Sequence, residues 1–194
     1  MSDERREYFR IDDEIALDYR LIDESETEAL SERIHARVPD RFTVASSFTA
    51  TSRQMAQALH KVQNQSPELV RCLQAIDQKL NMLAQLLVSE EMHIDQQPTR
   101  EVNLSAGGLA FRSQHEISTG SLLEMRMVLF PSLIGILNLS RVIHCERVSD
   151  GNVQFPWQVA VTFEQLRETD RELLVRHVMA KQTRRLRSER LEGD

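Results

Sequence analysis

Glycine is absent from the first 106 residues of this 194-residue chain, and all six glycines lie after that point. Glycine marks turns and destabilises the interior of helices. Its absence therefore predicts long helices in the first half of the chain. Its return predicts shorter elements joined by turns in the second half.

Other absences exclude whole classes of protein. No run approaches the roughly 18 apolar residues that a membrane-spanning helix needs, so we expect no integral membrane protein. The first residues go straight into charges without an apolar leader, which argues against secretion by a signal peptide. The only cysteines, Cys72 and Cys145, stand in different kinds of segment. We expect reduced thiols in a cytoplasmic protein, not a disulfide or a metal site.

Catalysis and nucleic-acid binding have equally little support. The six histidines never pair at the i, i+4 spacing of a helical metal site, and no serine stands in a G-x-S-x-G motif. We therefore expect neither a metal centre nor an enzyme. The net charge of −6 argues against DNA or RNA as a partner.

Helices should fill most of the chain up to position 97. A strand comes first, because Ile15, Leu17, Tyr19 and Leu21 alternate with polar residues inside the stretch 11–22. The acidic residues 12–14 before this alternation are most simply a solvated turn. Apolar spacing, an Ala-, Gln- and Ser-rich composition and a Ser-Pro pair then predict helices at residues 23–38, 43–64 and 67–92.

After Pro98 the pattern changes to short apolar stretches separated by Gly, Pro, Asn or Ser. They predict antiparallel strands at residues 100–104, 109–113, 122–129, 136–144 and 157–163. A closing helix at 167–190 places on one side Leu173, Leu174, His177, Val178 and Leu186. Its basic residues are Lys181, Arg184, Arg185, Arg187 and Arg190. They form a solvated face or, alternatively, a contact for an acidic partner or for the phosphates of a ligand.

The predicted fold is α+β: a six-stranded antiparallel β-barrel with a C-terminal helix, interrupted by a long helical insertion. We expect residues 1–22 to form an N-terminal arm and the first barrel strand. Residues 23–97 should form the insertion, and residues 98–194 the rest of the barrel and the closing helix. The first strand is then separated in sequence from the rest of its own barrel.

Two short motifs contain the residues of a candidate binding site. Arg6 and Arg10 precede the first strand, four positions apart, and supply two planar forks of N–H donors suited to phosphate and to the O6/N7 edge of guanine. The turn N-L-S-A-G-G, residues 103–108, supplies short polar groups and a backbone that a ligand can approach closely. Each motif alone is also typical of a solvated tail or a tight strand connection.

Together these motifs resemble the PilZ domain, the bacterial receptor module for cyclic di-GMP. That family is marked by R-x-x-x-R on an N-terminal arm and by [D/N]-x-S-x-x-G on the barrel. Arg6 and Arg10 match the first motif, and Asn103, Ser105 and Gly108 match the second. The stretches LAFRS, GSLLEMRMVL, RVIHCER and WQVAVTF and the closing helix also follow the family's pattern. The resemblance covers residues 5–22 and 98–190.

The resemblance implies a non-enzymatic, cytoplasmic receptor that binds cyclic di-GMP and signals to a partner protein. The implied ligand-binding residues are Arg5, Arg6, Arg10, Asn103, Ser105, Gly107 and Gly108. The arginines would clamp phosphates and guanine faces, and Arg5 matches a position that favours a stacked pair of ligands. The alternative is a PilZ-shaped oligomeric scaffold or adaptor that does not bind cyclic di-GMP.

The insertion carries a heptad pattern. Spacings of 4-3-4-3-4 place Leu73, Leu80 and Leu87 at a positions and Leu69, Ile76 and Leu83 at d positions. The pattern predicts a coiled-coil seam between copies of the chain or, alternatively, an amphipathic helix packed on its own barrel. Leucine without β-branched residues at a favours more than two strands, so we expect a tetramer ahead of a dimer. The heptads resemble those of a tetrameric variety of PilZ protein.

Overall fold

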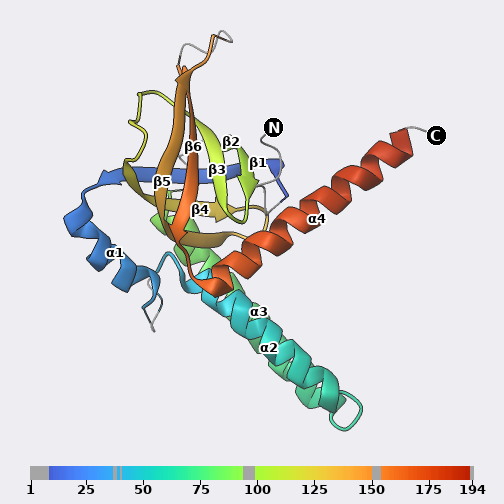
Figure 1. Ribbon diagram of the computed structural model, residues 1–194. Helices are drawn as coiled ribbons and strands as arrows, with labels where there is room; N and C mark the ends of the chain where they lie inside the picture. Colours follow the sequence, from blue (N-terminus) through green and yellow to red (C-terminus); the bar gives the residue numbers. More distant parts are fainter. Residues whose placement is uncertain (1–8, 37–38, 40, 94–98, 150–153, 193–194) are drawn as a thin grey trace.

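The computed structural model describes residues 9–36, 39, 41–93, 99–149 and 154–192. Figure 1 shows a barrel from which helices project. In chain order the elements are β1 (Ile11–Ile22), a 3₁₀ turn (Glu24–Glu26), α1 (Thr27–Ile34), α2 (Val44–Val62), α3 (Pro67–Glu91), β2 (Arg100–Ser105), β3 (Gly108–Ser113), β4 (Leu122–Leu129), β5 (Ile134–Arg147), β6 (Trp157–Gln165) and α4 (Glu168–Glu192).

The six strands close into a barrel in the order β1-β2-β3-β6-β5-β4, with every neighbouring pair antiparallel. The predicted fold class is therefore confirmed. The helices between β1 and β2 do not prevent closure, because β1 contacts strands on both sides. Residues 11–15 of β1 pair with β2, and residues 15–22 pair with β4.

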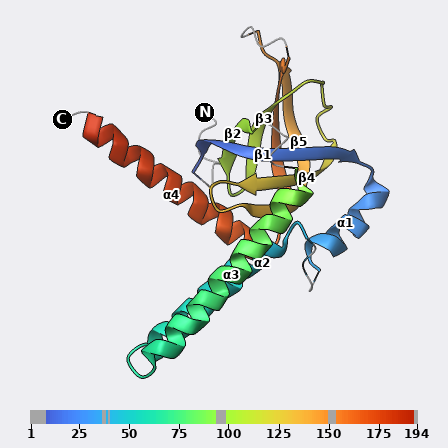
Figure 2. The same cartoon turned by 180° about the vertical axis from the view of Figure 1, so that it is seen from behind.

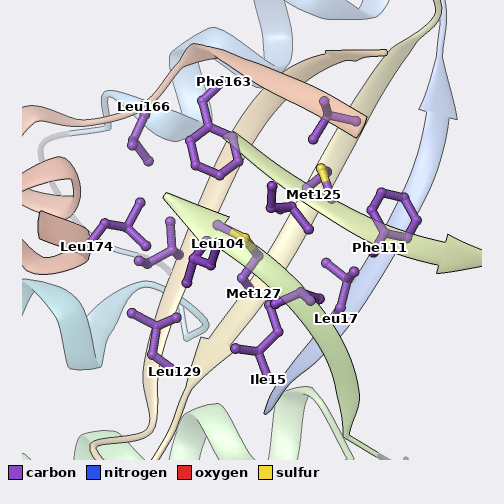
Figure 3. Packing of buried hydrophobic residues seen from close by; sticks show 14 of the residues in the cluster. Ile15, Leu17, Leu104, Phe111, Met125, Met127, Leu129, Phe163, Leu166 and Leu174 are labelled. Atoms are coloured by element: carbon purple, nitrogen blue, oxygen red, sulfur yellow. The ribbon is translucent and has the colours of Figure 1, made fainter. Parts of the chain in front are cut away.

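The barrel interior is filled by side chains from every strand and from α4. Ile15, Leu17, Leu104, Met125 and Met127 are each at most 3% exposed, and Figure 3 shows them pointing toward one another. The alternation seen in the sequence of β1 places Ile15 and Leu17 on this inner face. Leu174 of α4 closes the cluster at one end.

A second apolar cluster joins the outside of the barrel to the inserted helices. It contains Ala16 of β1, Leu137 of β5 and, from the helical region, Leu30, Phe42 and Val88. The segment before α2 lies directly on β5, because a Cβ at Gly135 would meet the carbonyl oxygen of Phe42 at 2.3 Å. No side chain fits between the two backbones, so the start of α2 is held against the barrel wall.

The α2–α3 hairpin extends away from the barrel, in a direction different from that of α4 (Figures 1 and 2). Ser52 of α2 donates a hydrogen bond to Asp77 of α3 at 2.6 Å and accepts one from Asn81 at 2.8 Å. Across the described residues, no helix combines the length and apolar character that crossing a bilayer requires.

Three expectations need correction. Residues 12–14 are not a solvated turn, because β1 begins at Ile11 and buries Asp13 to 6% exposure. The helix expected at 23–38 is a 3₁₀ turn followed by α1, which ends at Ile34; of its predicted apolar residues, Val38 lies outside the described residues. Leu186 does not join the buried apolar cluster of α4: it is 50% exposed and lines an open groove between α4 and the start of β1.

Candidate functional site

Arg10, the described arginine of the first motif, lies beside the second motif on the barrel. The register of β1 against β2 pairs Ile11 with Leu104 and Asp12 with Asn103. Nη1 of Arg10, just before β1, donates to Oδ1 of Asn103 at 3.3 Å. The insertion therefore returns the chain to the place it left. Arg5 and Arg6 lie outside the described residues.

The turn between β2 and β3 is held closed from within. Ser105 is buried; its hydroxyl donates to the carbonyl of Gly108 at 3.0 Å and accepts from the N–H of Gly107 at 3.3 Å. The carbonyl of Gly107 accepts from the N–H of Phe163 at 2.9 Å. Arg171 of α4 donates to the carbonyl of Ala106 at 2.8 Å. Ser105 and the glycines thus fix the turn against β6 and α4, while Asn103 stands on the outer face.

Asp12 adds a negative charge to this outer face. Nδ2 of Asn103 donates to Oδ1 of Asp12 at 2.8 Å, so the amide of Asn103 lies between Arg10 and Asp12. A hollow of about 680 Å³ lies beside them over β1, β2 and β3, and its lining includes Asp12, Asp13, Glu14 and Glu101 as well as Arg112 and Lys181. This part of the barrel face is therefore more acidic than basic.

A separate groove of about 390 Å³ lies between the start of β1 and α4. Arg10 and Asp12 line one side, and Lys181, Gln182 and Arg185 line the other. Nη1 of Arg185 lies 4.0 Å from Oδ2 of Asp12. Three cations and one carboxylate therefore surround the groove, which gives it a net positive charge.

Beneath these surfaces, a buried ionic cluster ties β1 to α4. The fully buried carboxylate of Asp13 contacts Nε2 of His177 at 2.5 Å and Nζ of Lys181. Burial raises the pKa of Asp13, but its hydrogen bonds with His177 and Lys181 outweigh burial and bring the pKa below its usual value. The cluster stabilises the charged form of Asp13 and fixes the position of α4 against β1.

Acidification should therefore lower the folding stability of the parent protein by more than it lowers that of the variant Asp13→Asn. A carboxyl with a lowered folded pKa contributes stability above its unfolded value of 3.8, and this contribution is lost as the pH falls through the folded pKa. At neutral pH the free energy of unfolding of Asp13→Asn should be about 2 kcal/mol lower than that of the parent, because His177 and Lys181 lose a charged partner. The difference in the free energy of unfolding between the parent and Asp13→Asn should narrow below about pH 4. Urea unfolding at several pH values measures it.

Asp18→Asn is the matched control, since it removes an exposed aspartate from the same strand. It should leave the unfolding free energy at neutral pH nearly unchanged. A gap between the parent and Asp13→Asn that stays constant down to pH 3 would contradict the assigned role of the Asp13 carboxylate.

The other end of α4 contacts the inserted helices. Arg167 pairs with the buried Asp170 at 2.9 and 3.1 Å and donates to Ser46 at 2.7 Å and to Ser47 at 3.2 Å. Burial raises the pKa of Asp170, against the opposing effect of Arg167. Arg53 of α2 lies 3.8 Å from Glu172. The helix α4 thus contacts both β1 and the inserted helix α2.

The predicted heptad residues lie mostly on the outside of the α2–α3 hairpin. Leu69, Ile76, Leu80 and Leu83 are 45–58% exposed, and Leu73 and Leu87 are half-buried. The contact of α3 with α2 and the barrel buries Val70, Ala84 and Val88 instead. Both cysteines are free. Within the described part of the chain, no group of His, Cys, Asp or Glu is placed to hold a metal ion.

Sequence reasoning missed Asp12, Asp13 and His177. Two patterns pointed to the buried pair: Asp13 has the same parity as Ile15 and Leu17 on the strand, and His177 shares the apolar side of the closing helix with Leu173 and Leu174. Asp12 is different, because only the register of β1 against β2 places it beside Asn103.

Comparison with known proteins agrees with the barrel fold described above. The family model of the PilZ domain matches residues 80–180. One similar solved structure is a pathogenic protein from Xanthomonas campestris, a tetrameric PilZ domain self-assembled via an unusual helical bundle; the TM-score is 0.55 at 15% identity, over 93% of this chain and 91% of that one. At this identity the likeness shows the fold alone. No curated protein matches the chain.

Proposed function

Because the chain belongs to the PilZ domain family, we propose that it is a receptor for cyclic di-GMP that assembles into a homo-oligomer and acts on a partner protein. PilZ domains are generally non-catalytic binding modules, so the proposal assigns no reaction. The observation that carries it is the contact between Arg10 and Asn103, one residue from each family motif.

The residues around this contact suit the ligand chemically. Cyclic di-GMP carries two phosphates and two guanines, and a guanidinium fork can bind either a phosphate or the guanine edge. Arg10 is exposed, and Lys181 and Arg185 face the same groove. The proposed site comprises Arg10 and Asn103 with the turn residues Ser105, Gly107 and Gly108, and also Arg5 and Arg6 of the arm. The ligand is thus expected at the junction of arm, turn and groove.

Arg10→Ala should lose most of the affinity for cyclic di-GMP. Removing one charge-assisted contact costs about 1.5–3 kcal/mol, or roughly ten- to hundredfold in Kd. The change should not unfold the protein, because Arg10 is exposed and precedes β1. Isothermal titration calorimetry at micromolar protein and excess ligand measures the effect.

Arg71→Ala is the control, an exposed arginine on the α2–α3 hairpin, which extends away from the barrel. It should bind like the parent. No heat of binding for the parent would contradict the receptor proposal and favour the scaffold described below.

The proposed assembly rests on the exposed apolar residues of α3. Leu69, Ile76, Leu80 and Leu83 lie along a helix of 25 residues at heptad spacing. Apolar side chains in such a row are typical of an interface, because leaving them in water forfeits the free energy of their burial. The tetrameric assembly of the Xanthomonas campestris protein through a helical bundle supports a tetramer ahead of a dimer.

A second candidate function is an oligomeric PilZ scaffold or adaptor that binds no cyclic di-GMP. The observation that favours it is Asp12, whose carboxylate accepts from Asn103 at 2.8 Å. A fixed negative charge at that position repels phosphate. The calorimetric experiment with the parent protein separates the two candidates.

A further inference from the structure

The groove between β1 and α4 has features of an anion site that the family motifs do not include. Lys181, Gln182 and Arg185 lie on one face of α4, since residues four apart are neighbours on a helix. Arg10 faces them from the start of β1. Guanidinium and ammonium groups from two different elements therefore converge on one space.

Asp12 lies where these groups would hold an external anion. Its Oδ1 accepts from Nδ2 of Asn103 at 2.8 Å, and its Oδ2 lies 4.0 Å from Nη1 of Arg185. Arg10 contacts the other end of the Asn103 amide at 3.3 Å. The carboxylate thus has an amide donor in contact and the guanidinium group of Arg185 at 4.0 Å, while the guanidinium group of Arg10 lines the same groove. Guanidinium and amide donors of this kind also suit a phosphate group.

We infer that α4 forms the second wall of the nucleotide site, in which Arg185 binds a phosphate group and Asp12 is the internal anion that this phosphate displaces. The inference rests on the proposed function and extends it, since it adds a binding residue and a built-in competitor. Asp12 is 79% and Arg185 67% exposed, so both can exchange partners without disturbing the core. Lys181 stays with Asp13 and contributes its charge from the floor of the groove.

This arrangement gives two substitutions effects of opposite sign. Arg185→Ala removes a side chain that would bind a phosphate group of the ligand, and should weaken binding of cyclic di-GMP about tenfold. Asp12→Asn removes the competing charge but keeps an acceptor for Asn103, and should strengthen binding about three- to tenfold. A purely structural role of either residue would not produce the gain in affinity.

The test is calorimetry of the full chain with cyclic di-GMP for the parent, Arg185→Ala and Asp12→Asn. Arg187→Ala is the matched control, because it removes the same charge from the same part of α4 but does not line the groove. It should change the affinity by less than about twofold, as expected for a screened surface charge. Circular dichroism establishes that each variant is folded.

The possible results separate this inference from the proposed function. Weaker binding by Arg185→Ala together with tighter binding by Asp12→Asn supports the inference. Binding by Asp12→Asn alone, when the parent binds nothing, would show that phosphate does not displace Asp12 and would overturn the inference. A parent that binds, an Arg10→Ala variant that does not, and unchanged affinities at positions 12 and 185 would overturn the inference while the receptor function stands. Absence of binding by both the parent and Asp12→Asn would overturn both.

Discussion

The double variant Ile76→Asp, Leu83→Asp should sediment as a monomer of 22.4 kDa, whereas the parent should sediment as an oligomer, most simply a tetramer. Assembly would bury both positions among apolar side chains. Burying an unpaired carboxylate at each of these positions would make assembly less favourable by roughly several kcal/mol. In the single chain the two side chains are 50% and 58% exposed, so the hairpin itself should keep its helices. Analytical ultracentrifugation at tens of micromolar protein, with circular dichroism, measures both quantities.

Ile143→Asp, Met179→Asp is the matched control. Ile143 on β5 and Met179 on α4 are also 50% and 58% exposed, but they lie outside the heptad pattern. This variant should keep the parent's sedimentation coefficient. A parent that sediments as a monomer, or a control that dissociates equally, would show that the apolar row on α3 is not the interface.

Gly108→Ala should cause the largest loss of folding stability among single substitutions of the motif residues. A Cβ at this position would lie 2.1 Å from the carbonyl oxygen of Val161, a backbone atom. The neighbouring strand cannot withdraw easily, because β3 and β6 pair from Gly108–Thr162 to Ser113–Trp157. We expect a loss of about 3 kcal/mol or more in the free energy of unfolding, measured by urea denaturation at neutral pH.

Gly120→Ala separates this steric effect from backbone strain. Gly120 has a positive φ of 91°, but beyond its two chain neighbours no residue has an atom within 4 Å of its added Cβ. Its replacement should cost only about 1 kcal/mol. Equal losses in the free energy of unfolding for the two variants would show that close packing of β3 against β6 is not what excludes a side chain at position 108.

Much of the barrel could be predicted from local patterns. The runs that became β2 to β6 are short, apolar and bounded by turn residues, and Gly, Pro and Asn separate them. The contact of Arg10 with Asn103 was implied by the family motifs, and the pairing of β1 with β2 provides it.

The acidic residues of β1 could not be interpreted locally. Consecutive acidic residues predict a solvated turn. Asp13 is nevertheless buried, because His177 and Lys181 of the last helix, α4, pair with its carboxylate. The parity of Asp13 on the strand and the place of His177 on the apolar side of α4 are each visible in the sequence, but no local pattern pairs the one with the other. The same holds for Arg185, which meets Asp12 only because α4 crosses the start of β1.

The close contact of Phe42 with Gly135 has a geometric consequence for the proposed oligomer. Because α2 begins at Val44, two residues after that contact, and Val88 of α3 packs in the same cluster as Phe42, the base of the hairpin is held against the barrel. Its 25-residue helix α3 is about 37 Å long at 1.5 Å per residue. If the proposed oligomer forms through α3, barrels attached to such hairpins would hold the proposed nucleotide sites at fixed spacings. A partner with two or more recognition surfaces would then gain avidity only if its own spacing matches.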